Sequence, residues 1–239
     1  MALLSWQTGK LIDTAEHGPA TRSFRFEVTG VNDFTFKPGQ FITLDLPIHE
    51  KPNKRLRSYS IVSWPDGTNQ FELLVVQTPG GAGTQFLFHD LQPGGEIKFR
   101  GAQGVFTIPE DLNGSIFLIC TGTGVAPFRS MIQYIYKQGL QPENLHLIYG
   151  CRTRDELLYF EEFNQMASEI PGFHYHPVLS RENWDGLQGR VHAVYESLCA
   201  GKPESRFYLC GWKHMVDEAR QRIRDLGFPD KSVHLELYG

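Results

Sequence analysis

The pattern of hydrophobic residues changes near residue 111 of this 239-residue chain, and this change limits the possible folds strongly. Before it, segments such as 23–28, 40–46 and 96–99 alternate apolar and polar side chains, which is the pattern of half-buried β-strands. Turns rich in proline and glycine separate these segments. Residues 1–111 are therefore expected to form a small antiparallel β-barrel or sandwich.

Apolar, strand-like runs alternate with amphipathic helical patterns in residues 112–239. The expected strands are 115–120, 145–149, 173–179, 207–210 and 233–237, and the expected helices are 128–137, 154–168, 191–198 and 215–226. Thr153 and Glu156 have the spacing of a capping box, which predicts that the second of these helices begins near residue 154. The alternation predicts a second domain of the α/β class, with a mostly parallel sheet and helices on both faces.

Composition and charge exclude several classes of function. There are 23 Lys and Arg against 27 Asp and Glu, and the net charge of −4 argues against a general nucleic-acid binder. No apolar run approaches the ~20 residues of a membrane span, and the first residues lack a signal-peptide pattern, so the cytoplasm is the expected location. The four cysteines contain no close pair for an iron–sulfur cluster. His174 and His176 alternate on an expected strand without a third ligand in view, so no metal site is expected.

A loop containing two glycines follows the first expected strand of the second domain. Thr121, Gly122, Thr123 and Gly124 lead from this strand into an expected helix. Glycines let backbone N–H groups approach a phosphate closely, and the following helix directs its positive end at the anion. The loop therefore predicts a phosphate site at the carboxyl edge of the sheet; a tight turn without a ligand is the alternative.

Arginines lie at or near the ends of two further expected strands. Arg152 and Arg181 come just after these strands, and Arg190 follows closely behind the second. Guanidinium groups that converge on one edge of a sheet form a site for an anion. The 2′-phosphate is the anion that distinguishes NADPH from NADH, so the three arginines favour NADPH; three ordinary surface charges are the alternative.

The first domain has its own polar cluster in Arg57, Ser58, Tyr59 and Ser60. A strand would place Arg57 and Tyr59 on one face and the two serines on the other. Taken alone, this is compatible with an ordinary strand whose arginine forms a salt bridge. Downstream, the glycine-rich residues 80–84 form a second candidate anion cradle, with Thr84 as the expected N-cap of a short helix over residues 84–91.

Five motifs, taken in order, resemble the ferredoxin–NADP(+) reductases and their flavin-dependent relatives. They are Arg-x-Tyr-Ser at 57–60, the glycine-rich turn that ends at Thr84, Gly-Thr-Gly-x-Ala-Pro at 122–127, Ser-Arg-Glu at 180–182 and Tyr-x-Cys-Gly at 208–211. The resemblance extends from about Ser5 to Tyr238. It implies an antiparallel β-barrel flavin-binding domain, residues 1–111, followed by an α/β parallel-sheet NADP-binding domain, residues 112–239.

The resemblance also implies a flavin site. Its residues would be Arg57, Ser58, Tyr59, Ser60, Gly83 and Thr84. Arg57 would contact the flavin pyrophosphate, Tyr59 would pack against the isoalloxazine ring, and Ser60 would lie near flavin N5. FAD is the implied cofactor, with FMN as the alternative, and NADPH is the implied substrate.

The nucleotide site and the catalytic residues are implied in the same way. The nucleotide site would contain Thr121, Gly122, Thr123, Gly124, Arg152, Ser180, Arg181, Arg190 and Gly211. Cys210 would lie beside the reacting nicotinamide carbon, and Tyr238 would stack on the flavin face that nicotinamide must reach. Glu236 would move a proton or stabilise nicotinamide, and Ser60 would donate a hydrogen bond to N5. Hydride would pass between nicotinamide C4 and flavin N5.

The implied activity is electron transfer between NADPH and a one-electron carrier. Lys51, Lys54 and Arg55 lie next to the flavin motif, and such a basic cluster would steer an acidic ferredoxin or flavodoxin; a solvated loop is the alternative. Two other enzymes fit the motifs: an NAD(P)H-dependent reductase component of an oxygenase, and a reductase of free flavin or quinone. A flavin-binding electron-relay subunit is the alternative that is not an enzyme.

Overall fold

The structure is a computed structural model that describes residues 4–18, 20–201 and 204–238. Contacts within this part divide the chain into two units. The first unit extends to Ile108 and also includes Arg129–Tyr134, and the second holds the remaining residues from Pro109 onward. Each unit is built on a six-stranded sheet.

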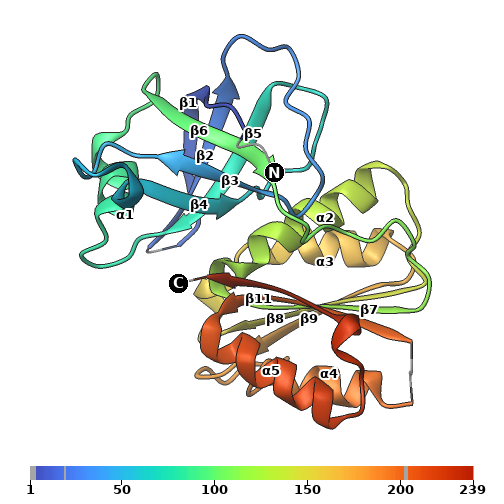
Figure 1. Ribbon diagram of the computed structural model, residues 1–239. Coiled ribbons are helices and arrows are strands. Elements are labelled where there is room, and N and C mark those ends of the chain that lie inside the picture. The colour runs from blue at the N-terminus through green and yellow to red at the C-terminus, as the bar shows by residue number, and fades with distance from the viewer. Residues whose placement is uncertain (1–3, 19, 202–203, 239) are drawn as a thin grey trace. The chain divides into compact units, whose positions relative to one another are not determined.

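The first unit is an antiparallel barrel (Figure 1). Its strands are β1 (Gln7–Glu16), β2 (Thr21–Val28), β3 (Phe41–Asp45), β4 (Leu56–Ser60), β5 (Gln70–Val76) and β6 (Glu96–Gln103), in the order β4-β3-β6-β1-β2-β5. Ile61, directly after β4, forms an antiparallel bridge with Leu73 on β5, so the two outer strands also meet and the sheet closes. Three helical turns complete the unit: η1 (Pro52–Lys54), α1 (Ala82–Gln85) and the π-helical turn η2 (Phe86–Asp90). The predicted antiparallel β-domain is confirmed.

Phenylalanine rings form the centre of this barrel. The rings of Phe26, Phe34 and Phe99 surround Phe71 with centroid distances between 5.1 and 5.4 Å. The alternation of apolar and polar residues in the sequence produces this core. On β2, Phe24 and Phe26 point inward and are fully buried, while Arg25 between them is exposed. A rigid, close-packed barrel of this kind is a firm support for side chains on its strands.

The second unit is a parallel α/β sheet. Its strands are β7 (Ser115–Thr121), β8 (Asn144–Cys151), β9 (Phe173–Leu179), β10 (Leu187–Gln188), β11 (Ser205–Trp212) and β12 (Val233–Tyr238), in the order β10-β9-β8-β7-β11-β12. The connections contain α2 (Ala126–Lys137), α3 (Phe160–Glu169), α4 (Val191–Cys199), α5 (Lys213–Asp225) and the turns η3 (Gly122–Val125), η4 (Arg154–Glu156) and η5 (Asp230–Ser232). Helices α4 and α5 lie on one face and α3 on the other, as predicted (Figure 1).

The predicted start of the helix after β8 is wrong. Residues 154–156 form only the turn η4, and α3 begins six residues later, at Phe160. The Thr153 side chain caps no helix, and the Glu156 carboxylate accepts the backbone N–H of Arg152 instead of that of Thr153. Leu157 and Leu158 are both buried, and we infer that their burial stabilises the chain more than a helix beginning at residue 154 would.

A row of stacked rings crosses the sheet of the second unit. Phe207, Phe117, His146 and His174 pair in register on β11, β7, β8 and β9, with neighbouring centroids 4.9 to 5.2 Å apart. His146 Nδ1 and His176 Nε2 are 3.0 Å apart, so one ring nitrogen donates a hydrogen bond to the other. Among the described residues, no group of three or more His, Cys, Asp or Glu side chains is placed to hold a metal ion. These histidines form part of the packing of the sheet.

The His146–His176 contact predicts a loss of stability in mild acid. Burial, with a smaller effect of His174, lowers the pKa of His176 from 6.5 to about 4. The unfolded chain therefore binds more protons than the folded chain between these pH values. Neutral His176 therefore makes its full contribution to the free energy of unfolding above pH 6.5. As the pH falls toward 4, the free energy of unfolding decreases by on the order of 1 kcal/mol, after allowance for the solvent exposure of the ring. Urea unfolding from pH 7 to 4.5 should show this slope, and His176→Gln should flatten it; an equal slope in the variant contradicts the assignment.

No helix in the described part of the chain is both long enough and apolar enough to cross a membrane.

Candidate functional site

Arg57 extends from β4, and one of its three guanidinium nitrogens is used in hydrogen bonds within the chain. Its Nη1 donates to the backbone oxygens of Leu56 and Lys54, at 2.7 and 3.2 Å. Its Nε and Nη2 groups donate to no atom of the described chain. An arginine held by one nitrogen, with the others open, is prepared to bind an anion in a forked arrangement.

The glycine-rich turn of the barrel lies directly against this arginine. A Cβ atom on Gly83 would lie 3.1 Å from Arg57 Cγ and 3.2 Å from Nε, so only glycine leaves that side chain its position. The two motifs, more than twenty residues apart in sequence, therefore meet. Open donors beside a glycine in the first turn of α1 fit the pyrophosphate of a flavin dinucleotide.

Thr84 is not the N-cap that its position in the sequence predicted. The cap is Gly81, and Thr84 lies within α1. The Thr84 hydroxyl accepts the N–H of Thr78 at 3.1 Å and lies within reach of the carbonyl oxygens of Thr78 and Gly81. Thr84 therefore holds the turn that presents Gly83, because its hydroxyl is used within the turn.

Tyr59 and Ser60 complete the polar segment of β4. Arg57 and Tyr59 lie opposite the core residues Leu44 and Ile42 of β3, on one face as expected. Burial raises the pKa of Tyr59 to about 12, against a smaller lowering by Arg57, so its hydroxyl stays neutral. Ser60 is buried.

Ser58 lies on the other side of β4. It is exposed and shares a hydrogen bond of 3.0 Å with Thr43, which in turn accepts the side-chain amide of Gln103.

In the second unit, the loop after β7 packs tightly against the end of β11. A Cβ atom on Gly124 would lie 2.5 Å from the carbonyl oxygen of Cys210 and 2.9 Å from Gly211 Cα. Gly122 has a φ of +55° with open space around it. The hydroxyl oxygen of Thr121 is buried and has no hydrogen-bond partner in the described part of the chain. Close backbone approach, an open glycine and an unused hydroxyl at the carboxyl edge fit a nucleotide.

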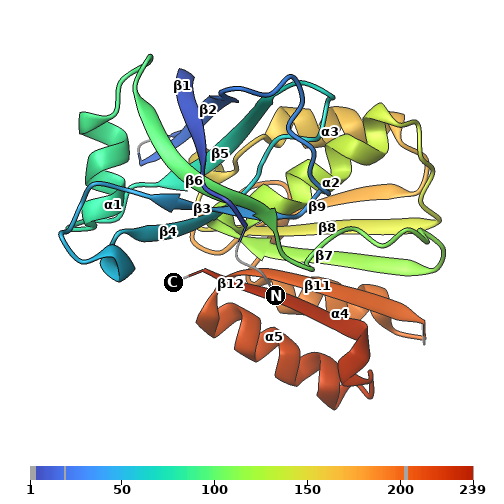
Figure 2. The ribbon, with the colours of Figure 1, turned by 45° about the horizontal axis from the view of Figure 1, so that its top comes forward.

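Cys210 lies beside the end of the chain. β12 lies beside β11 (Figure 2) and pairs with it in parallel. This pairing places Cys210 opposite Glu236 and Trp212 opposite Tyr238. Burial, with a smaller effect of Glu236, raises the pKa of the Cys210 thiol well above its usual value, and a hydrogen bond with Tyr238 opposes this rise. Cys210 therefore remains a neutral, compact thiol at physiological pH.

Two of the predicted arginines lie on neighbouring chain segments. Beyond the ends of β8 and β9, the backbone N–H of Ser180 donates to Cys151 and that of Arg181 donates to Arg152, at 3.0 and 2.9 Å. The guanidinium groups of Arg152 and Arg181 form no ion pair within the described chain, and both residues are exposed. Their charges are therefore available to a ligand.

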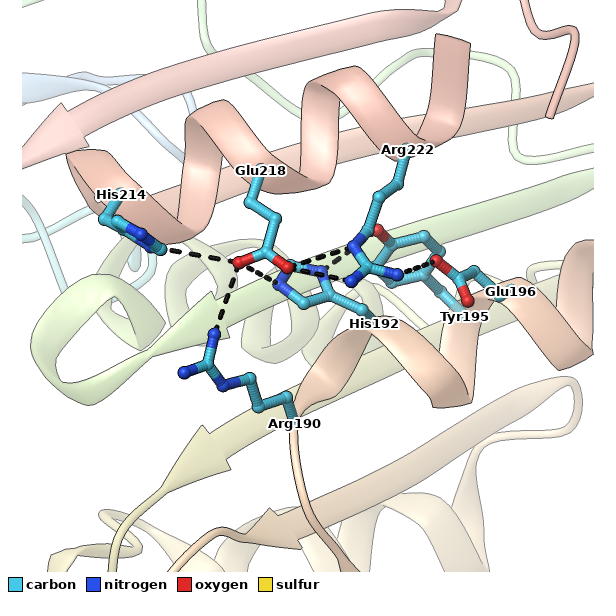
Figure 3. Close-up of polar contacts among 7 residues, drawn as sticks. All are labelled: Arg190, His192, Tyr195, Glu196, His214, Glu218 and Arg222. Atoms are coloured by element: carbon cyan, nitrogen blue, oxygen red, sulfur yellow. Dashed lines mark hydrogen bonds and ion pairs between the residues drawn. The ribbon is translucent and has the colours of Figure 1, made fainter. Parts of the chain in front are cut away.

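Arg190 is at the same edge, but its charge is partly engaged. The N–H of Gly189 donates to Leu179, which brings Arg190 to the end of β9, where it is the N-cap residue of α4. Its Nη1 is 3.3 Å from a carboxylate oxygen of Glu218 on α5 (Figure 3). Glu218 could not be found from the sequence, because its only signal there is its helical spacing to His214 and Arg222.

The basic cluster near the flavin motif is smaller than the sequence suggested. Lys51 and Lys54 are exposed. Arg55 forms a salt bridge of 2.7 Å with Asp45 and also donates to the carbonyl oxygen of Leu46. The freely presented charges of the cluster are therefore the two lysines.

Comparisons with known proteins agree with a flavin-binding domain followed by a nucleotide-binding domain. Residues 8–108 match a family model described as an oxidoreductase FAD-binding domain, and residues 118–221 match one described as an oxidoreductase NAD-binding domain. The chain is 34% identical over 238 residues to ferredoxin–NADP reductase B of Sorangium cellulosum, covering 96% of each chain. It is 29% identical over 224 residues to a glycine betaine monooxygenase reductase subunit of Chromohalobacter salexigens, covering 91% of this chain but 60% of that protein.

Solved structures show the same architecture. The Amycolatopsis cytochrome P450 reductase GcoB superposes with a TM-score of 0.87 at 26% identity, covering 98% of this chain and 70% of that one. A ferredoxin NADP+ reductase from Neisseria gonorrhoeae with bound FAD and NADP superposes with a TM-score of 0.79 at 23% identity, covering 99% of both chains. The first unit accordingly binds FAD, and the second unit binds a nicotinamide dinucleotide.

Proposed function

The chain belongs to the ferredoxin–NADP(+) reductase family of flavin-dependent oxidoreductases, and from this premise we propose that it transfers electrons between NADPH and a small one-electron carrier, a ferredoxin or a flavodoxin. The observation that carries the NADPH part is the pair Arg152 and Arg181, two exposed residues whose backbones are hydrogen-bonded to each other at the carboxyl edge of the sheet. The likeness to ferredoxin–NADP reductase B, which extends over 96% of both chains, supports the carrier. We also propose 1–111 and 112–239 as the bounds of the flavin and nucleotide domains.

We assign the residues of each site as follows. Bound FAD supplies the exchange of a hydride for single electrons. Arg57 would hold the pyrophosphate with its open donors, Gly83 would give that arginine room, and Tyr59 would pack against the ring system; Ser58 and Ser60 are assigned to the same site. For the nucleotide, Thr121 and residues 122–124 hold the pyrophosphate, while Arg152, Ser180, Arg181 and Arg190 hold the 2′-phosphate and adenosine. Cys210 and Gly211 lie against nicotinamide, with Glu236 and Tyr238 beside them.

Arg181→Ala tests the 2′-phosphate assignment. Loss of one charge-assisted contact to the phosphate should raise the KM for NADPH by about 10- to 100-fold. NADH carries a hydroxyl at that position, so its KM should change by less than about twofold. Steady-state rates with ferricyanide as acceptor measure both constants. Arg220→Ala removes the same charge from an exposed position on α5 and serves as the control; equal effects of Arg181→Ala on the two dinucleotides contradict the assignment.

The two exposed lysines test the docking surface. Lys51→Glu/Lys54→Glu should lower kcat/KM for reduction of ferredoxin several-fold at low ionic strength, and salt should remove the difference. Ferricyanide reduction should not change, since both lysines lie outside the proposed cofactor sites. Lys10→Glu/Lys98→Glu changes two exposed lysines of the same barrel and is the matched control. If the wild type and both double variants reduce ferredoxin with the same kcat/KM, the carrier docks on another surface.

The function as a whole is tested with a panel of acceptors. Purified protein reconstituted with FAD is assayed with NADPH and with NADH against ferredoxin, flavodoxin, free flavin and a quinone. The proposal expects the highest kcat/KM with NADPH and a protein carrier. A preference for free flavin or quinone would contradict it and identify a small-molecule reductase.

A reductase component of an oxygenase is the second candidate. It is favoured by the 29% identity, over 91% of this chain, to a monooxygenase reductase subunit. That relative is longer, since this chain spans 60% of its length. An oxygenase reductase would be expected to reduce an oxygenase centre faster than a free ferredoxin.

A further inference from the structure

The further inference concerns a carboxylate that shares one of the proposed NADPH-binding arginines. We propose that Glu218 is a counter-ion of Arg190 that competes with the 2′-phosphate for this arginine and so lowers the preference for NADPH over NADH. The inference rests on the proposed function, because it needs Arg190 at the 2′-phosphate. Glu218 is a positioning residue, since it acts through Arg190.

Glu218 lies at the centre of a network between α4 and α5 (Figure 3). One carboxylate oxygen, Oε1, accepts a hydrogen bond of 3.0 Å from Nε of Arg222 and forms an ion pair of 2.9 Å with Nη2 of the same residue. The other oxygen, Oε2, lies 3.3 Å from Arg190, 3.4 Å from His192 and 3.8 Å from His214. Arg222 also reaches Glu196 on α4 at 3.0 Å. The two oxygens therefore have different partners: Oε1 pairs with Arg222 one turn along α5, and Oε2 faces Arg190 and His192 at the start of α4 and His214 on α5.

Arg190 is the member of this network that is able to leave. Its side chain is 70% exposed, and the contact with Glu218 is the one ion pair that it makes in the described chain. Its backbone follows Gly189, whose N–H donates to Leu179, the last residue of β9 and the one before Ser180. A change of side-chain torsion angles is then sufficient to move the guanidinium toward a ligand at that edge, because the arginine stem is long and flexible.

Glu218 stays compensated after Arg190 leaves. Burial lowers the pKa of His192, an effect that Arg222 and Arg190 strengthen and that Glu218 and Glu196 oppose, so this histidine is neutral at pH 7. Tyr195 Oη and His192 Nδ1 are 3.0 Å apart. This contact with Tyr195 holds the His192 ring in place, with Nε2 3.4 Å from Oε2 of Glu218. Because Arg222 stays paired with Oε1, the carboxylate keeps a positive partner when Arg190 departs.

The competition acts on one dinucleotide only. The 2′-phosphate of NADPH and the Glu218 carboxylate both attract Arg190, and the two anions also repel each other. NADPH must therefore displace Glu218 before Arg190 can bind the 2′-phosphate. The apparent affinity for NADPH is then the intrinsic affinity multiplied by the fraction of molecules in which Arg190 is free. NADH has no phosphate at this position and does not meet the competitor.

Glu218→Gln is the variant that tests this. It removes the charge and keeps the size and helical character of the side chain. The probes are adenosine 2′,5′-bisphosphate, which carries the 2′-phosphate, and 5′-AMP, which does not; calorimetry measures their binding to the FAD-loaded protein. We expect the bisphosphate to bind about three- to fivefold more tightly, as for release from a surface ion pair, with 5′-AMP binding as before. In steady-state assays of Glu218→Gln, the KM for NADPH should fall and kcat should stay unchanged. Glu218→Asp, which restores the charge, should return the bisphosphate affinity toward that of the wild type.

Two controls separate this effect from altered helix packing. Glu196→Gln removes the same charge from the same network but touches Arg222 and not Arg190, so it should leave the ratio of the two affinities unchanged. Glu218→Gln in an Arg190→Ala background should also have no effect on that ratio, because the shared arginine is gone. Thermal unfolding of each protein reports any loss of packing, and Glu218→Ala replaces Glu218→Gln if the amide variant is unstable.

The outcomes distinguish the inference from the function on which it rests. If Arg190→Ala weakens only the bisphosphate while Glu218→Gln and Glu218→Ala leave both affinities unchanged, Arg190 binds the phosphate and the inference is overturned. If Arg190→Ala affects both probes equally, Arg190 does not recognise the 2′-phosphate, and the inference is overturned together with that assignment. Arg181→Ala then still tests NADPH binding independently.

Discussion

Arg57→Ala should yield a folded barrel that retains little FAD. The guanidinium of Arg57 has its Nε and Nη2 donors open, beside Gly83, and the alanine variant removes all of them. Charge-assisted hydrogen bonds of this kind contribute about 1.5–3 kcal/mol each, so the dissociation constant for FAD should rise by about 100-fold. Fluorescence titration of the apoprotein with FAD measures the constant.

Two further variants show whether the effect belongs to the site. Arg57→Lys keeps the charge but loses the planar fork, so it should bind FAD with an intermediate affinity. Arg25→Ala removes an exposed arginine from β2 of the same barrel and should bind FAD as the wild type does. If Arg57→Ala binds FAD normally, the pyrophosphate is held elsewhere, and the role proposed for Gly83 is lost with it.

Local patterns predicted much of this fold because the residues that set them act over short distances. Alternation along β2 predicted which side chains enter the barrel, and glycine in the loop after β7 predicted a close approach of the backbone. Both features are consequences of neighbouring residues and backbone geometry. The division into a barrel and a parallel sheet follows from the same patterns, since the period of the apolar residues differs between the two halves.

The helix after β8 shows where local patterns fail. The capping-box spacing of Thr153 and Glu156 is a preference of about 1 kcal/mol, whereas burial of Leu157 and Leu158 contributes several times as much. The chain therefore forms only the turn η4 before the two leucines, and α3 begins after them, at Phe160. The sequence contains both signals, and only the packing determines which one dominates.

Charge pairing was the other feature that the sequence could not predict. Arg55 and Arg190 looked like available cations, but Asp45 and Glu218 lie within reach of them only in the fold. These pairs are separated by ten and twenty-eight residues, and no local rule links residues so far apart. Arg152 and Arg181, by contrast, remain without acidic partners in the described chain, which makes them the stronger candidates for an anion site.

Gly124→Ala should nearly abolish reduction of any acceptor by either dinucleotide. The added methyl group would lie 2.5 Å from the carbonyl oxygen of Cys210 and 2.8 Å from its carbonyl carbon, and both atoms belong to the backbone of a buried strand. The loop must therefore move away from β11. A displacement of about 1 Å in a catalytic site typically lowers the rate by about 100-fold, so kcat/KM should fall at least that far. kcat/KM should fall equally for NADPH and NADH, because the proposed site places the loop against the pyrophosphate and nicotinamide that the two dinucleotides share.

Gly122→Ala provides the contrast within the same loop. Gly122 has a φ of +55° and no atom within 4 Å of its missing Cβ, so alanine there brings strain of about 1 kcal/mol but no collision. It should retain most of the activity and unfold at a slightly lower temperature, while Gly124→Ala should lose activity far beyond its loss of stability. FAD content should be unchanged in both, since the loop belongs to the nucleotide unit. Similar activities in the two variants would mean that the contact between the loop and β11 does not position the nicotinamide.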